Sequence, residues 1–155
     1  MTLSRPTLIL LAGLGSAAMM LGALGFQYIG EMPPCKLCYW QRYPHIAAIV
    51  IALIALAIPG RLWPLLGALA ALTTAGIGLY HTGVERKIWE GPASCSSASI
   101  EGLSVDALLD QIRSAPIVRC DEVAWEMLGL SMPSWNALAS IILALIWLWA
   151  ARSRV

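Results

Sequence analysis

The sequence predicts an all-α membrane protein: a bundle of four transmembrane helices, with a short amphipathic helix in the second periplasmic loop. Hydrophobic residues make up 59% of the 155 positions and charged residues 12%, which is too apolar for a water-soluble domain. Four stretches contain no Asp, Glu, Lys or Arg, and each is about long enough to cross a hydrocarbon core roughly 30 Å thick. We therefore expect a single integral membrane domain over residues 1–155.

The expected spans cover about residues 7–29, 39–58, 62–82 and 133–151, and the loops that carry cysteine cover about 30–38 and 83–132. The first span follows Arg5 and could be read as a secretory signal, but its apolar run is too long for a signal peptide. Pro59, Gly60 and Pro64 interrupt the helical pattern, so the second and third spans should form an antiparallel hairpin.

Small residues recur at four-residue spacing in two of the spans. Ala18 and Gly22 lie in the first span, and Gly67, Ala71 and Ala75 lie in the third. Small side chains let membrane helices approach closely. We expect both faces to lie at helix–helix contacts.

The long loop contains one amphipathic segment, "LSVDALLDQIR". Val105, Leu108, Leu109 and Ile112 follow the i, i+3, i+4, i+7 spacing of a helix, and Ser104 is a candidate N-cap. This short helix could lie flat on the bilayer surface and bury its apolar stripe there. Packing against the ends of the spans is the equal alternative.

The basic residues indicate the orientation. With four spans, both termini and the turn at Arg61 share one side, which holds four arginines and no acid, whereas all nine carboxylates fall on the other side. The positive-inside rule places the termini in the cytoplasm. In a bacterial inner membrane the cysteine loops would then face the periplasm, where disulfides persist.

The motif "CKLC" places Cys35 and Cys38 where the second span begins. A thiol near a helix amino terminus is stabilised as thiolate by the helix dipole and therefore favours redox chemistry. Arg42 lies one helical turn beyond Cys38 on roughly the same face and would stabilise that thiolate. An arginine at the membrane edge points to function, although its side chain could simply reach the lipid headgroups.

His81 should lie at a similar depth at the outer end of the third span, either as part of this polar site or as an interfacial anchor. A dithiol beside a cation at the membrane edge suits electron transfer to a lipid-soluble acceptor, and a quinone fits because it gains negative charge on oxygen as it is reduced. The second pair, Cys95 and Cys120, is expected on a mobile aqueous loop that another protein could reach.

Two other classes of protein compete with this interpretation. A four-cysteine zinc site usually has two closely spaced pairs, and Cys95 and Cys120 do not form such a pair, so we expect no metal. A structural membrane scaffold, with both disulfides acting only as staples, is the main alternative.

Four motifs carry a resemblance to a known family: "CKLCYWQR", "YHTGVE", "GPASC" and "RCDEVAWEMLGLSMPSWN". In this order among four spans, the chain resembles, over essentially its whole length, the DsbB family of quinone-dependent disulfide-generating membrane proteins. The resemblance implies a protein-dithiol:quinone oxidoreductase of the bacterial inner membrane. Its partner would be a periplasmic DsbA-like thiol oxidase with a thioredoxin fold, its cofactor ubiquinone or menaquinone, and no nucleic acid would be involved.

The resemblance also implies an order of events among the cysteines. Cys95 would form the mixed disulfide with the partner, Cys120 would exchange with Cys35, and Cys38 would be released as the thiolate that reduces quinone. A vitamin K epoxide reductase-like enzyme shares the four-helix, quinone-reactive architecture. In that family, however, the loop cysteines precede the CxxC, and here the order is reversed.

Three further positions match the family's quinone site or lie beside it. Arg42 and His81 correspond to the family's arginine and histidine near the quinone. Glu85 stands where the best-known member has glutamine, which leaves its role open. A specialised member that serves one dedicated DsbA-like partner is a further alternative.

Overall fold

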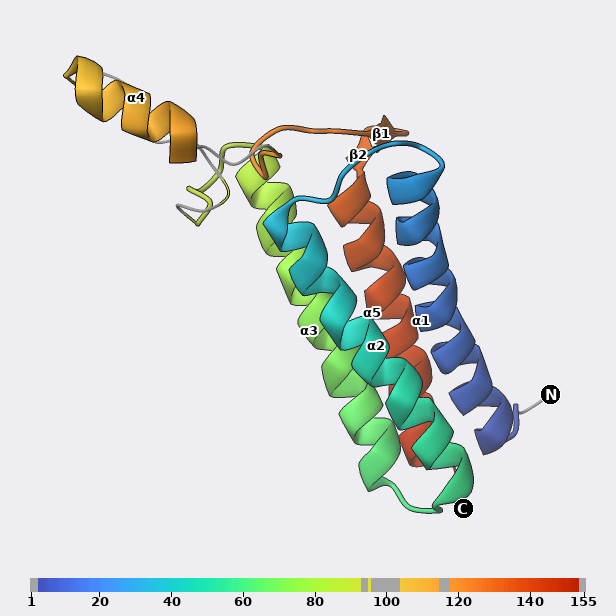
Figure 1. The fold of residues 1–155 in the computed structure, drawn as a ribbon. Helices are drawn as coiled ribbons and strands as arrows, with labels where there is room; N and C mark the ends of the chain where they lie inside the picture. Colours follow the sequence, from blue (N-terminus) through green and yellow to red (C-terminus); the bar gives the residue numbers. More distant parts are fainter. Residues whose placement is uncertain (1–2, 93–94, 96–103, 115–117, 154–155) are drawn as a thin grey trace.

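The computed structural model describes residues 3–92, 95, 104–114 and 118–153, and four long helices form its body (Figure 1). These are α1 (Arg5–Tyr28), α2 (Lys36–Ala57), α3 (Leu62–Glu85) and α5 (Met132–Arg152). Each is long and apolar enough to cross a membrane. The predicted all-α, four-span fold is confirmed.

Two helix boundaries differ from the expected ones. α2 begins at Lys36 because Cys35 acts as its N-cap: the Cys35 sulfur accepts a hydrogen bond from the Cys38 backbone N–H at 3.3 Å. The whole CxxC motif therefore forms the first turn of the helix. α3 continues to Glu85, so His81 and Glu85 belong to one continuous helix.

Helix α3 packs closely on α5, as its small residues predict. A side chain at Gly67 would place its Cβ 2.5 Å from the Trp147 ring, and Ala71 and Ala75 are buried. Trp147 fills the space that Gly67 leaves, so this pair fixes the approach of the two helices.

The corresponding expectation for α1 is wrong. Ala18 and Gly22 are exposed, and a Cβ added at Gly22 would meet nothing within 4 Å. The packing face of α1 is instead formed nearer its start, where a Cβ at Gly13 would lie 2.6 Å from Ala52. Ala18 and Gly22 are small where a cavity opens beside α1.

The outer surface of the bundle is apolar. Leu14, Leu21 and Leu53 are among many leucines and isoleucines with exposed side chains on the long helices. Because α-helices satisfy their own backbone hydrogen bonds, such a surface is stable in hydrocarbon. The bundle is built to be covered by lipid.

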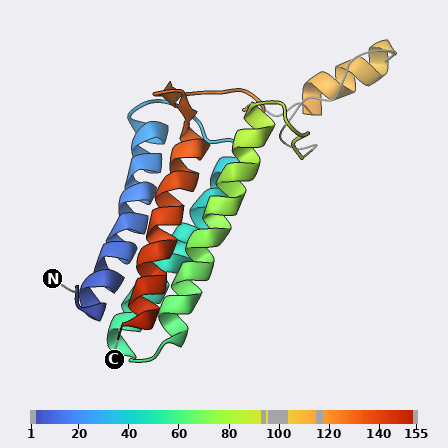
Figure 2. The ribbon, with the colours of Figure 1, turned by 180° about the vertical axis from the view of Figure 1, so that it is seen from behind.

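The two ends of the bundle differ. Both termini and the α2–α3 connection lie at one end, and the segments that carry cysteine lie at the other (Figures 1 and 2). At the cysteine end, β1 (Glu126–Met127) and β2 (Leu130–Ser131) form a hairpin that leads into α5. Leu128 and Gly129 both have positive φ, 54° and 77°, as a tight two-residue hairpin turn requires.

The predicted amphipathic helix is present as α4 (Val105–Ser114). It stands away from the four long helices (Figures 1 and 2) and does not pack on their ends. Val105 and Leu109 have exposed side chains. Of the two arrangements considered, this favours the membrane surface, which stays a prediction.

Candidate functional site

All four cysteines meet in one cluster at the cysteine end of the bundle. Cys35, Cys95 and Cys120 are buried against Leu37 and Val84, and Cys38 packs at their edge. The Cys35 and Cys38 sulfurs are 2.9 Å apart, and the Cys120 backbone N–H donates to the Cys95 carbonyl at 2.8 Å. The pair at the start of α2 and the pair from the long loop therefore form a single site in which every thiol is free.

Cys95 and Cys120 are both 0% exposed, so the expectation that another protein could reach this pair directly is wrong for this structure. Burial, with the contact to Cys120, raises the pKa of the Cys95 thiol to about 12. The hydrogen bond to Cys38, together with burial, raises the pKa of Cys35. Both thiols therefore keep their protons at neutral pH.

Asp121 fastens the Cys120 segment to the end of α3. Its carboxylate accepts two hydrogen bonds from Arg119, at 3.0 and 2.8 Å, and one from Lys87 at 2.8 Å. The Lys87 ammonium also donates to the Asp121 carbonyl at 2.7 Å. The bonds to Arg119 hold the pKa of Asp121 well below its usual range, and Lys87 lowers it further. Asp121, Arg119 and Lys87 thus form an ionic clamp beside Cys120.

His81 lies beside the first cysteine pair. Its Nε2 is 3.7 Å from the Cys35 sulfur, and the backbone of Cys120 is also within hydrogen-bonding reach of the ring. The ligand atoms of His81, Cys35 and Cys38 all lie within 4.8 Å of one another. Two thiolates on a tetrahedral zinc, with bonds of about 2.3 Å, would sit about 3.8 Å apart. The 2.9 Å between the sulfurs suits disulfide chemistry better.

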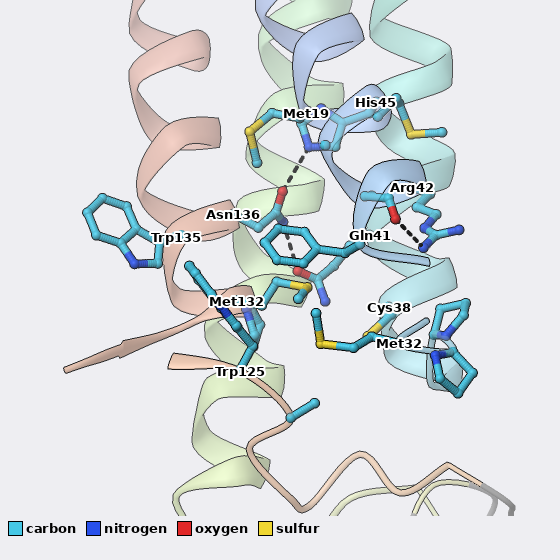
Figure 3. Close-up of a pocket in the computed structure, with 18 of the residues that line it drawn as sticks. Met19, Met32, Cys38, Gln41, Arg42, His45, Trp125, Met132, Trp135 and Asn136 are labelled. Atoms are coloured by element: carbon cyan, nitrogen blue, oxygen red, sulfur yellow. Dashed lines mark hydrogen bonds between the residues drawn. The ribbon is translucent and has the colours of Figure 1, made fainter. Parts of the chain in front are cut away.

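A cavity of about 260 Å³ opens between α1, α2 and α5, and it extends from Cys38 towards the middle of the bundle (Figure 3). Of the four cysteines, only Cys38 lines it. Arg42 lies on the same wall, and most of the remaining lining is apolar, including Met19, Phe26 and Trp125. The cavity therefore joins one sulfur and one cation to an apolar chamber at the edge of the bundle.

Arg42 is turned across the cavity wall towards α1. Its Nη1 donates to the Gln27 Oε1 at 2.6 Å, its Nη2 donates to the Ala23 carbonyl at 3.4 Å, and the guanidinium lies 5.1 Å from the centre of the Tyr39 ring. These contacts hold the cation within the bundle wall, which is a different arrangement from a side chain extended to the headgroups.

His81 and Glu85 are not among the residues that line this cavity. Both are buried in α3, and α3 contributes none of the lining. Glu85 is hydrogen-bonded to Ser131, and its Oε2 has no partner among the described residues. A role in quinone binding stays a prediction for both residues.

The structure contains a chain of polar side chains that sequence reasoning missed. The His45 Nε2–H donates to Asn136 Oδ1 at 2.9 Å, the Asn136 amide donates to Gln41 Oε1 at 2.8 Å, and the Gln41 amide donates to His81 Nδ1 at 2.9 Å. Gln41, His45 and Asn136 also line the cavity (Figure 3). Thr74 joins the chain from α3, donating to the Gln41 carbonyl at 2.9 Å.

These hydrogen-bonded side chains connect the cavity to the cysteine cluster through residues of α2, α3 and α5. Every donor along it points from His45 towards His81, which leaves the His81 Nε2–H directed at the cysteines. The signal in the sequence was the presence of uncharged polar residues inside the predicted spans, which by default mark function.

Four transmembrane helices that hold four cysteines above a lateral cavity define a multi-pass membrane protein of thiol–disulfide chemistry. Residues 5–150 match the family model described as "Disulfide bond formation protein DsbB". The chain belongs to the DsbB family of disulfide-forming membrane proteins.

Of three similar proteins, two carry names that agree with this assignment. "Disulfide bond formation protein B 2" of Pseudomonas syringae is 32% identical, over 90% of this chain and 83% of the relative. "Disulfide bond formation protein B" of Stutzerimonas stutzeri is 29% identical over 96% of both chains. "Uncharacterized protein RP370" of Rickettsia prowazekii is 35% identical over 76% of this chain and 70% of the relative. No solved structure matches the chain.

Proposed function

We propose that the protein is a protein-dithiol:quinone oxidoreductase that reoxidises a periplasmic DsbA-like thiol oxidase and passes two electrons to membrane quinone. One observation carries the proposal: of four clustered cysteines, only Cys38 reaches the lateral cavity, and Arg42 lies on the same wall. A structural scaffold held by disulfides would have no need of that arrangement.

The residues around the cavity fit a quinone. Phe26, Trp125 and the methionines offer apolar and aromatic surface to a flat ring, and the polar groups are few and convergent, as in most small-molecule sites. The cavity opens between helices of the bundle, where a lipid-soluble molecule can enter from the bilayer. A bound quinone would accept two electrons and two protons from the protein.

The cysteines would act in sequence. A thiolate of the reduced partner attacks Cys95 in a Cys95–Cys120 disulfide and frees Cys120 as a thiolate. The partner's second thiol then attacks the partner's sulfur in this mixed disulfide, so the partner leaves as a disulfide and Cys95 leaves as a thiol. Cys120 attacks Cys35 in a Cys35–Cys38 disulfide, so the Cys38 thiolate leaves. Cys95 then attacks Cys120 in the Cys35–Cys120 disulfide, which restores the Cys95–Cys120 disulfide and frees Cys35. The Cys35–Cys38 dithiol would pass two electrons and two protons to a bound quinone and become a disulfide again, so the quinone gains what the partner dithiol loses.

The packing of the cluster supports this order. Cys35 and Cys120 belong to the same buried cluster. The raised pKa of the Cys35 thiol makes Cys35 the poorer leaving group of its pair, so Cys38 is the sulfur that leaves as thiolate. Cys38 lies in the first turn of α2, where the helix dipole stabilises negative charge. Arg42 supplies a positive charge beside the cavity into which Cys38 faces.

The proposal includes a bacterial inner-membrane location, with both termini cytoplasmic and the cysteine end periplasmic. The concentration of arginines and the lack of acids at the terminal end support it. Either ubiquinone or menaquinone would satisfy the cavity.

The test uses purified protein, a reduced DsbA-type protein and a short-chain quinone, with quinone consumption followed by absorbance. We expect catalytic turnover that Cys38→Ser abolishes. A wild-type protein that consumes no quinone would return the structural scaffold to favour. A specialised member would turn over with one DsbA-like protein and fail with others, which comparing several partners would reveal.

A further inference from the structure

A second cavity lies at the opposite end of the bundle, among the ends of α1, α2 and α5. It is open, has a volume of about 910 Å³, and is lined by two arginines, Arg5 and Arg152. Two serines accompany them, Ser4 and Ser153, and the remaining lining is apolar. Neither the disulfide chemistry nor the first cavity gives this site a purpose.

Arg5 is the unusual member of the site. Its side chain is only 8% exposed, its Nη2 donates to the Gly60 carbonyl, and its Nε is buried with no partner among the described residues. It also lies in the first turn of α1, which contains no acidic residue. A cation there faces the positive end of the helix dipole, so an anion would stabilise both.

The chain supplies no Asp or Glu side chain for these arginines. All nine Asp and Glu residues occur at position 31 or between positions 85 and 126, in or beside the two segments that carry cysteine. The ion pairs of the described residues are all formed there. Because burying a charge without an opposite charge is costly, an anion from outside the chain would stabilise Arg5.

We propose that this cavity binds the phosphate of an anionic phospholipid, with Arg5 and Arg152 as its cationic ligands. The apolar part of the lining favours a lipid over a free phosphate. Ile9, Leu56 and Trp149 line the same cavity, and Leu56 and Trp149 are partly exposed on the lipid-facing surface. A headgroup at the arginines would let an acyl chain follow this surface, as in basic pockets between membrane helices.

Native mass spectrometry of the full-length, delipidated protein in neutral detergent tests the proposal. Phosphatidylglycerol and phosphatidylcholine with identical acyl chains are titrated in parallel. We expect one tightly bound phosphatidylglycerol per chain and no matching phosphatidylcholine. Equal affinity for both lipids would overturn the proposal, because a site built from two arginines must discriminate by charge.

Single variants identify the ligands. Arg152→Gln changes an exposed residue in the last turn of α5 and should leave folding intact. We expect it to weaken phosphatidylglycerol binding about fivefold, which corresponds to about 1 kcal/mol for one cation. Arg5→Gln should weaken it at least as much.

Arg61→Gln is the matched control, since Arg61 lies in the α2–α3 connection at the same end but does not line the cavity. A loss in this variant equal to that in Arg152→Gln would mean general surface attraction and would refute a defined site. Glycerol phosphate at the same concentration is the last arm. If it displaces phosphatidylglycerol, the ligand is a soluble phosphate and the lipid assignment is wrong.

Discussion

Adjacent threonines on α3 offer a test of the buried polar chain. The Thr74 hydroxyl donates to the Gln41 carbonyl at 2.9 Å and accepts from the Asn136 amide at 3.1 Å. Thr73 is exposed and donates only to the Leu69 carbonyl of its own helix, at 2.8 Å. Thr→Val keeps the shape of the side chain and removes the hydroxyl. The same chemical change can therefore be made at a residue that belongs to the buried polar chain and at a neighbour that does not.

Thr74→Val removes two hydrogen bonds from a dry site. Interhelical hydrogen bonds in membrane proteins contribute about 0.6 kcal/mol each, and those in soluble proteins about 0.5–1.5 kcal/mol each. We therefore expect Thr74→Val to lower the free energy of unfolding by about 1–3 kcal/mol. Thr73→Val should change it by less than about 0.5 kcal/mol, as surface substitutions usually do.

Unfolding in mixed micelles of dodecyl maltoside and SDS, followed by far-ultraviolet circular dichroism, measures both variants under the same conditions. The two variants must differ by more than the error of the unfolding fits. Equal stability of Thr74→Val and Thr73→Val would refute the reasoning. The hydroxyl in the buried polar chain would then contribute no more to the free energy of unfolding than an exposed one.

Three further outcomes are expected. Arg42→Ala should raise the KM for quinone roughly 10- to 100-fold, because a hydrogen bond to a charged group contributes about 1.5–3 kcal/mol. Thiol exchange with the partner should stay largely intact. An unchanged KM would exclude this role. Cys120→Ser, mixed with the reduced partner, should accumulate a mixed disulfide at Cys95, and mass spectrometry that locates it at Cys35 would reverse the relay. Asp121→Asn should destabilise the protein by about 1 kcal/mol, because the clamp is partly exposed. Because the pKa of Asp121 is lowered in the folded protein, this difference is full above its ordinary pKa of 3.8 and declines progressively as the pH falls below it towards the lowered pKa. Unfolding measured from pH 2 to 7 should show the start of this decline.

The sequence predicted the spans well because a bilayer imposes a rule that can be read along the chain. Charges are excluded from the hydrocarbon, and every backbone polar group within it must be bonded, so uncharged stretches become helices. The start of α2 was missed by three residues for a local reason. Cysteine is not among the usual N-cap residues, yet the Cys35 sulfur fills that role.

The hairpin before α5 was missed for a similar reason. Leu128 adopts a positive φ, which is uncommon for any residue other than glycine. A pattern-based reading of "MLGLS" therefore gives no strong turn signal at the leucine. Hydrogen bonds from outside the hairpin hold the turn instead: Arg86 donates to the Gly129 carbonyl at 2.8 Å and Trp135 donates to the Met127 carbonyl at 3.2 Å.

The buried polar chain could not be predicted, because it depends on the rotation of three helices about their axes. His45 and Gln41 share α2, but Asn136 lies 91 residues beyond His45 on α5. Spacing along one helix fixes which residues share a face, and it leaves open which neighbouring helix that face meets. The same limit applies to Ala18 and Gly22, whose small side chains border a cavity where a helix contact was expected.

The burial of the second cysteine pair bears on how the relay could stay orderly. With Cys95 and Cys120 both shielded from solvent, a partner can reach a sulfur only where the chain gives way. Lys87, just after α3, anchors Asp121 and with it the segment next to Cys120. Cys95 contacts the Leu37 backbone, donates its N–H to the Pro92 carbonyl and accepts the bond from Cys120. In the proposed relay, an opening at Cys95 that leaves the Lys87–Asp121 ion pair in place would keep Cys120 close to Cys35, the sulfur it is proposed to attack.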